Sequence, residues 1–332
     1  MTSSARVAVT LGDPRGIGPE VSFAAVRTGS FARSAITFYG PKPFAVQAPE
    51  GCGFIPVCNR DLDYSQDRGA GAVAVEAIVR AVSDILAGRQ DAVVTAPVHK
   101  PSLRAAGLRH PGHTEFLCEL SGAGEVGMLM AAEEIPGRSP LRVLLATTHH
   151  PLADVPGLVT SELLVSQSLL LSRELGERWK IDRPRIALCS LNPHASDGGI
   201  FGNEEEDVYA PALDRLRHLG AEVRGPISAD TVFVRALAGE FDAVVAPYHD
   251  VGMAAFKTAA FGKGVNVTLG IPFVRTSPDH GTAFDIAGTG QADPGSMREA
   301  LELAARLARP RSGASPSVAR PHGSAPSPAL SA

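Results

Sequence analysis

Residues 247–281 read PYHDVGMAAFKTAAFGKGVNVTLGIPFVRTSPDHG, a stretch in which short apolar runs alternate with isolated polar side chains. Apolar runs such as Ala243–Ala246 and Val265–Leu269 predict strands. In open α/β sheets, the side chains just past strand ends line the ligand crevice. Solvated loop charges are the alternative, but exposed charges usually stand in runs, and these stand singly. We expect an α/β sheet whose functional side chains come from this set: His249, Asp250, Lys257, Asn266, Arg275, Asp279 and His280.

The composition indicates a globular protein with a large core. The chain has 332 residues, of which 44% are hydrophobic and 20% charged, which is enough apolar surface for two lobes. Its formal net charge of -4, with scattered Lys and Arg, provides no basic surface for nucleic acid or for an anionic membrane. The start of the chain lacks a signal-type apolar segment, and no run of about 18 apolar residues occurs. We expect a soluble cytoplasmic protein.

Further apolar runs along the chain alternate between strand and helix patterns, which supports the α/β class. A glycine turn at Gly12–Pro14 leads from the first strand into a helix, and it fits either an anion cradle or a tight connection. The predicted strands are Val7–Leu11, Ala35–Tyr39, Ala92–Thr95, Leu141–Ala146 and Arg185–Cys189, and the predicted helices include Thr160–Leu175 and Ala229–Leu237.

Residues 69–74 match the letters of a dinucleotide-binding glycine fingerprint, with Asp91 about 20 residues further on. The fingerprint needs a strand immediately before it, and residues 60–68 are polar without a strand pattern. We therefore interpret the segment as the start of an amphipathic helix that runs to about Leu86 and is closed by Gly88.

Three histidines share one local context, because each follows an apolar strand by a few residues: His149, His194 and His249. This spacing predicts that the three imidazoles lie along the same rim of one sheet or pair of lobes. Three neutral imidazoles with one open position suit a catalytic divalent metal that polarises a substrate oxygen. Structural, hydrogen-bonded histidines are the alternative, and His150 beside His149 is a competing ligand.

A second group of residues fits an anion. Lys257, Asn266 and Arg275 could clamp a phosphate or a carboxylate, since Arg offers a bidentate fork and Lys a point charge. His113 and Thr114 stand at a predicted helix start, where His113 could hold an anion or merely cap the helix. The sequence therefore predicts an anion site beside the metal site.

Three features carry no predicted chemistry. The acidic run Glu204–Asp207, with Asn203 and Glu206 in a capping arrangement, is interpreted as helix-start charge. Residues 309–332 are rich in Pro, Ser, Ala and Gly, which predicts a disordered tail. The cysteines lack metal-type spacing, which predicts free thiols: Cys52, Cys58, Cys118 and Cys189.

With these residues assembled, the chain resembles the 4-hydroxythreonine-4-phosphate dehydrogenase family of pyridoxal phosphate biosynthesis over about residues 6–308. The resemblance implies a two-lobed α/β/α fold of the isocitrate and isopropylmalate dehydrogenase type over residues 1–308. It also implies a homodimer with the active site at the subunit interface. The blocks that carry it are GDPRGIGPE, TAPVHK, GHTEF, TTHHPL, LNPHA, APYHD, GVNVTLG and RTSPDHGTAFDIAG.

The resemblance assigns roles to the residues above. The family's metal ligands fall on His149, His194 and His249, and one divalent ion per site is implied: zinc, magnesium or cobalt. Its substrate contacts fall on His113, Thr114, Lys257, Asn266 and Arg275. We interpret Asp250 and Lys100 as candidates for proton transfer, or as residues that orient a metal-bound histidine. The family binds NAD, or NADP, without the glycine fingerprint.

The implied reaction is the oxidation of 4-phosphooxy-L-threonine to 2-amino-3-oxo-4-phosphooxybutanoate, which decarboxylates to 3-amino-2-oxopropyl phosphate. Two departures from the family pattern flank the site, Val251 after the Asp of YHD and Ala195–Asp197 after NPH. They leave open 4-phosphoerythronate, 4-phosphothreonate or a terephthalate cis-dihydrodiol as the substrate. A metal-dependent hydrolase is the alternative from another reaction class, and it would form product without reducing NAD.

Overall fold

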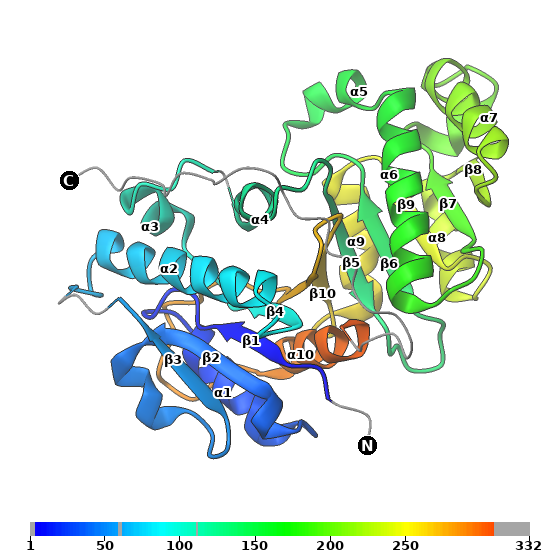
Figure 1. The fold of residues 1–332 in the computed structure, drawn as a ribbon. Helices are drawn as coiled ribbons and strands as arrows, with labels where there is room; N and C mark the ends of the chain where they lie inside the picture. Colours follow the sequence, from blue (N-terminus) through cyan, green and yellow to red (C-terminus); the bar gives the residue numbers. More distant parts are fainter. Residues whose placement is uncertain (1–3, 59–61, 111, 309–332) are drawn as a thin grey trace.

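One sheet of eleven strands forms the centre of the molecule, with helices on both of its faces (Figure 1). The computed structural model describes residues 4–58, 62–110 and 112–308. The strands are β1 Val7–Thr10, β2 Ile36–Pro41, β3 Gly53–Val57, β4 Ala92–Thr95, β5 Gly127–Ala132, β6 Leu141–Leu145, β7 Ile186–Cys189, β8 Val223–Ile227, β9 Ala243–Ala246, β10 Val265–Leu269 and β11 Val274–Pro278.

The helices alternate with the strands along most of the chain. They are α1 Gly18–Thr28, α2 Asp67–Leu86, α3 Lys100–Ala105, α4 His113–Ser121, α5 Val155–Leu158, α6 Ser161–Glu174, α7 Ala210–His218, α8 Ala229–Leu237, α9 His249–Ala260 and α10 Gly295–Leu307. Among the described residues no single helix is long and apolar enough to span a membrane, and one pair bent by 86° meets the length and composition test only jointly.

The sheet consists of two parallel blocks joined by antiparallel strands. Its order is β3-β2-β1-β4-β11-β10-β5-β6-β9-β7-β8. One block consists of five neighbouring parallel strands, β3, β2, β1, β4 and β11. The other consists of four, β6, β9, β7 and β8. The strands β10 and β5 make the antiparallel junction between the blocks. The predicted α/β class is confirmed, while the division of residues 1–308 into two lobes stays a prediction.

Both faces of each block are covered, which explains why β9 is apolar at every position and β4 at every position but its last, Thr95. In β4, Val93 packs with the residues of α2, and its neighbour Val94 packs on the other face with those of α1 and α10. In β9, Val244 packs with residues of α8 and α9, and Val245 packs toward α6. Figure 1 shows α2 and α10 on opposite sides of β1 and β4.

The glycines at residues 69–74 serve helix packing. They lie inside α2, so the interpretation of this segment as a helix rather than a dinucleotide turn is confirmed. A Cβ on Gly71 would lie 1.9 Å from the carbonyl oxygen of Ser102, and one on Gly69 would lie 2.1 Å from that of Asp63. Gly71 therefore lets α3 pack closely on α2, and Gly69 makes room for the backbone that leads into α2.

The predicted strands and helices are found with boundaries that differ by at most two residues, whereas several elements were not predicted. The edge strands β3 and β8 bury few residues and carry prolines, so they show little apolar pattern. The strand β11 contains Arg, Thr and Ser, and α9 begins inside the polar segment after β9. The predicted disordered tail, residues 309–332, lies outside the described residues. Cys52, Cys118 and Cys189 carry free thiols, as predicted.

Candidate functional site

The strand order places the three predicted metal histidines at one rim of the sheet. The strands β6, β9 and β7 are neighbours and run parallel. His149 follows β6, His249 follows β9 and His194 follows β7. Neighbouring strands are about 4.8 Å apart, so three consecutive carboxyl ends span about 10 Å. The carboxyl ends of the strands that precede the three histidines therefore lie along one rim, as the strand pattern predicts, while a shared site for the three imidazoles stays a prediction.

Two of the three imidazoles face each other. The ring centroids of His149 and His249 are 5.4 Å apart, and both rings line a cavity of about 110 Å³. Burial, with smaller effects from the positive charges of Lys100 and His249, lowers the pKa of His149. The Nδ1 atom of His249 is 2.7 Å from Oδ1 of Asp250, which leaves Nε2 free. A neutral ring and a carboxylate-oriented ring together are a donor set that fits a divalent metal.

His194 does not line this cavity. Its ring contacts Phe201, with centroids 6.4 Å apart, and its backbone has a left-handed φ of 53°. Over residues 4–58, 62–110 and 112–308, no three His, Cys, Asp or Glu side chains lie close enough to hold a metal ion. The three-histidine site thus stays a prediction, of which the structure brings two members together.

The loop that carries His194 is held by Glu205. This buried carboxylate accepts the backbone N–H groups of Leu191 and Asn192 at 2.9 and 2.8 Å, and the Ser196 hydroxyl also donates to it. Burial opposes ionisation, but these donors outweigh it and lower the pKa of Glu205. Glu205 lies in the first helical turn with Glu206 and Asp207, as predicted for helix-start charge, but the predicted side-chain cap does not form. Spacing alone could not reveal this role.

The predicted anion site centres on Arg275, which is only 3% exposed. Its guanidinium donates to two hydroxyls, Thr95 Oγ1 through Nε at 3.1 Å and Nη2 at 2.6 Å, and Thr268 Oγ1 through Nη1 at 3.1 Å. None of the described carboxylates forms an ion pair with it, and burial lowers its pKa to about 10. A buried cation without a counter-ion is costly, so this site favours an anionic ligand.

His113 lies beside Arg275 at the start of α4. Nη2 of Arg275 is 3.4 Å from Nδ1 of His113, and because Arg can only donate, Nδ1 must accept. The neutral ring then carries its hydrogen on Nε2, which is buried and has no partner. Burial, followed by the charges of Arg275 and Lys100, lowers the pKa of His113 to about 3. The helix cap is Gly112 without a side-chain bond, so the capping alternative for His113 was wrong.

The remaining predicted site residues lie around these two groups. Asn266, on β10, has a buried Oδ1 atom without a partner. Lys257, on α9, is already paired with Asp279, whose Oδ2 is 2.8 Å from its Nζ, so it is not a free cation. Lys100 lowers the pKa of both His113 and His149, so its charge acts on the anion site and on the histidine pair. Thr114 is half-buried in the first turn of α4.

The comparisons with known proteins agree with one another. Residues 36–304 match the family model described as pyridoxal phosphate biosynthetic protein PdxA. A 4-hydroxythreonine-4-phosphate dehydrogenase of Aromatoleum aromaticum is 43% identical over 92% of this chain and 98% of its own length. The chain belongs to the PdxA family. Among solved structures, the 4-hydroxythreonine-4-phosphate dehydrogenase of Klebsiella pneumoniae has a TM-score of 0.84 and 35% identity, covering 93% of this chain and 99% of that chain.

The fold of this PdxA-family chain extends to more distant dehydrogenases. A β-decarboxylating dehydrogenase of Thermococcus kodakarensis has a TM-score of 0.51 at 18% identity, covering 90% of this chain and 82% of that chain, a similarity of fold alone. The expected isocitrate and isopropylmalate dehydrogenase type of fold is thus confirmed. The relatives' names support a dehydrogenase, an enzyme class that needs a hydride acceptor.

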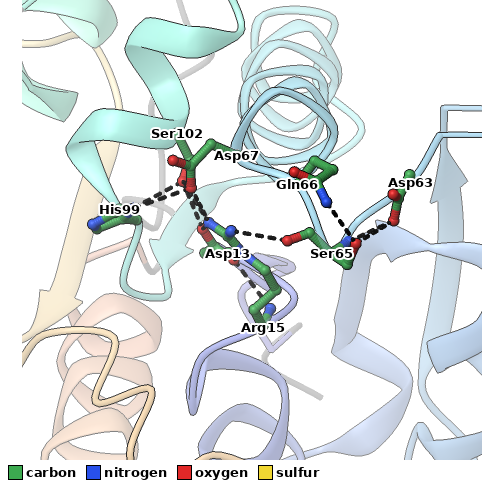
Figure 2. A network of polar contacts seen from close by, with 8 residues as sticks. All are labelled: Asp13, Arg15, Asp63, Ser65, Gln66, Asp67, His99 and Ser102. Carbon is green, nitrogen blue, oxygen red and sulfur yellow. Dashed lines mark hydrogen bonds and ion pairs between the residues drawn. The ribbon is translucent and has the colours of Figure 1, made fainter.

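A polar network that sequence reasoning missed joins two of the PdxA-family motifs, GDPRGIGPE and TAPVHK (Figure 2). Arg15 donates to Asp13 at 2.9 Å, to Asp67 at 2.8 Å and to the Ser102 hydroxyl. That hydroxyl also lies 2.9 Å from Nδ1 of His99, the residue before Lys100. The network therefore fixes the start of α3 and with it the backbone of Lys100. Its only signal in the sequence was that each motif is a turn-forming segment that contains glycine or proline.

The same turn excludes the anion cradle predicted as one alternative after β1. The N–H of Asp13 donates to the carbonyl oxygen of Pro97 at 3.0 Å, and those of Gly16 and Ile17 donate to Asp13 and Thr282. A Cβ on Gly12 would lie 2.2 Å from the same Pro97 oxygen, and its φ is 72°. The tight connection, the other alternative, is what the chain forms.

Proposed function

We propose that this PdxA-family chain oxidises 4-phosphooxy-L-threonine to 2-amino-3-oxo-4-phosphooxybutanoate, with NAD as hydride acceptor and a divalent metal as cofactor. The product then loses carbon dioxide and gives 3-amino-2-oxopropyl phosphate. The observation that carries the proposal is the buried guanidinium of Arg275, which no described carboxylate pairs, beside the orphan Nε2–H of His113. The substrate is proposed from the names of the relatives, which are 4-hydroxythreonine-4-phosphate dehydrogenases.

The anion site would bind the phosphate. A phosphate oxygen can accept from Nε2 of His113 and can supply the negative charge that Arg275 lacks. The first turn of α4 has no side-chain cap, so its N–H groups can also face an anion. Asn266 and Lys257, with Thr114, would contact the rest of the substrate, and Lys257 would do so beside Asp279. These contacts turn a diffuse encounter into a positioned one.

The histidine pair would hold the metal. His149 and His249 provide two imidazoles, and His194 would be the third ligand, from the same chain or from a second copy in a homodimer. When bound, a divalent ion supplies a Lewis acid that lowers the pKa of a nearby hydroxyl. Asp250 would orient His249 through the 2.7 Å contact with Nδ1.

Lys100 is the better placed of the two candidates for proton transfer. Asp250 has a side chain that is 87% exposed and engages its own neighbour, His249. Lys100, the first residue of α3, acts through its charge on both His113 and His149, which supports a place near both groups. We propose that Lys100, in its neutral amine form, takes the hydroxyl proton as the hydride leaves to NAD.

The deciding experiment measures NADH formation at 340 nm with three substrates, each with and without a chelator. We expect turnover with 4-phosphooxy-L-threonine, loss of turnover with the chelator, and at least about tenfold lower kcat/KM with 4-phosphoerythronate. Turnover confined to the terephthalate cis-dihydrodiol would refute the phosphate substrate. Product formation without NADH would instead identify a hydrolase.

A further inference from the structure

The described residues contain two buried arginines, and the chain treats them differently. Arg142, 7% exposed, meets both carboxylate oxygens of Glu133 at 2.7 Å. Arg275, 3% exposed, meets only hydroxyls and one imidazole nitrogen. The fold can therefore supply a carboxylate to a buried guanidinium, and it supplies neutral acceptors at Arg275. A neutral acceptor orients the guanidinium without cancelling its charge.

The hydrogen bonds define one orientation of Arg275. Its guanidinium has five N–H donors. Thr95 Oγ1 accepts from Nε and Nη2, and Thr268 Oγ1 accepts from Nη1. The second Nη2 hydrogen faces His113 over a long 3.4 Å contact, and one Nη1 hydrogen stays free. Two donors, one on Nη1 and one on Nη2, are thus weakly used or unused.

The sheet register makes this arrangement rigid. Thr268 and Arg275 are direct partners across the antiparallel pair β10 and β11, so their side chains lie on the same face. Thr95 ends β4, the parallel neighbour of β11 on its other side. Thr95 is 0% and Thr268 2% exposed, so neither hydroxyl serves solvent. Three strands thus hold one guanidinium from two sides.

We propose that Thr95, assisted by Thr268, is the positioning residue of the anion site, holding the Arg275 fork toward a phosphate group while leaving its charge uncompensated. This inference rests on the proposed function, because it assigns Arg275 to phosphate. A carboxylate at position 95 would satisfy the guanidinium equally well but would replace the ligand's charge. The hydroxyl is thus a requirement of binding rather than of folding.

Inorganic phosphate is the probe, titrated calorimetrically into the full chain at constant ionic strength. We expect Thr95→Val to weaken phosphate binding and to raise the KM for 4-phosphooxy-L-threonine by about tenfold, because two donors lose their acceptor. We expect kcat to change by less than about threefold, and Thr95→Ser to stay within about threefold of wild type in binding. Thr95→Asp should keep the fold while losing phosphate binding.

Thr276→Val is the matched control. Thr276 is a fully buried threonine on the same strand as Arg275, and its hydroxyl donates to the carbonyl oxygen of Ala300. If Thr95→Val binds phosphate as tightly as Thr276→Val does, the inference is wrong. If Thr95→Val does not fold, Thr268→Val replaces it, with about threefold weaker binding expected and unchanged binding counting against the inference.

Arg275→Gln separates this inference from the proposed function. Wild-type phosphate binding by Arg275→Gln would refute the assignment of the anion site and the inference with it. Lost binding in Arg275→Gln together with intact binding in Thr95→Val would refute only the positioning role. Lost binding in both, with rescue by Thr95→Ser, would support both.

Discussion

At the scale of single residues, the anion site combines a buried cation with a buried neutral imidazole. Arg275 donates to Nδ1 of His113, so protonation of the ring would place two positive charges in contact. The Nε2 atom is buried without a partner, so the ring has no local acceptor for a second hydrogen. Both facts keep His113 neutral and agree with its low pKa, which is caused first by burial and second by the neighbouring cations.

The pKa of His113 predicts how stability depends on pH. Its folded pKa of about 3 lies below the ordinary value of 6.5, so the unfolded chain binds the extra proton between these values. The neutral ring's contribution is complete above pH 6.5 and falls as the pH drops toward 3. From pH 7 to pH 5, the free energy of unfolding should fall by about 2 kcal/mol more in wild type than in His113→Gln. Urea unfolding at both pH values measures this, and parallel curves for the two proteins would contradict it.

Asp250 gives a second prediction at this scale. Its carboxylate holds Nδ1 of His249, so Asp250→Asn should weaken metal binding by about ten- to a hundredfold. Single-turnover hydride transfer at saturating metal should stay close to wild type, since the proposed proton acceptor is Lys100. Metal titration followed by stopped-flow NADH formation separates the two effects. Slow hydride transfer with full metal occupancy would make Asp250 the base instead.

At the scale of elements, the connection between β7 and α7 shows how a strained loop is held. His194, Ala195, Ser196 and Asp197 all have left-handed φ values, a conformation that is costly for residues other than glycine. Glu205, buried beneath the loop, accepts from Leu191, Asn192 and Ser196. One carboxylate therefore offsets strain over the whole segment that carries His194.

Replacement of Glu205 tests this anchor. We expect Glu205→Gln to lower the free energy of unfolding by about 2 kcal/mol, because the amide nitrogen cannot accept from the loop donors. Glu206→Gln is the matched control, since Glu206 is exposed, and its change should stay within about 0.5 kcal/mol. Chemical denaturation measures both. Equal stabilities of the two variants would show that the loop does not depend on Glu205.

At the scale of the whole molecule, the sheet brings the histidine rim and the anion site to one region. The rim belongs to the parallel block of β6, β9 and β7, and Arg275 belongs to the other block. His194 stands apart from the cavity of His149 and His249, on a loop whose tip exposes Ile200 and Phe201 by 72% and 46%. The histidine pair lacks its third predicted metal ligand, and the loop that carries this ligand has an exposed apolar tip. Together these features favour a metal site that a second copy of the chain completes.

Mixing of inactive variants tests a shared site. If His194 acts across a dimer, refolding His149→Ala with His194→Ala in equal amounts should restore about a quarter of wild-type activity, because half the dimers are mixed and each has one intact site. In the control mixture of His149→Ala with His249→Ala, both altered residues belong to the same subunit's half of the site. Every site then lacks one of the two histidines, so the mixture should stay inactive. Absence of rescue in the first mixture would place all three histidines in one chain.

Much of the fold could be predicted from local pattern. Ala92–Thr95 and Ala243–Ala246 were predicted with the bounds that they have, because buried parallel strands are near-continuous apolar runs. The strand β11 was missed because Arg275 and its neighbours are polar, although the strand is buried. The partners that make such residues tolerable lie far along the chain, as Thr95 does for Arg275, and local pattern does not contain them.

By itself, the sequence determined the α/β class, the helical state of residues 69–74 and the common rim of the strand ends that precede His149, His194 and His249, because apolar periodicity and strand-end position are local properties. The tertiary structure alone decided that Arg275 has hydroxyl partners in place of a carboxylate, that Glu205 supports the His194 loop, and that His149 pairs with His249. These contacts depend on strand order and register, which bring together residues as far apart as Thr95 and Arg275.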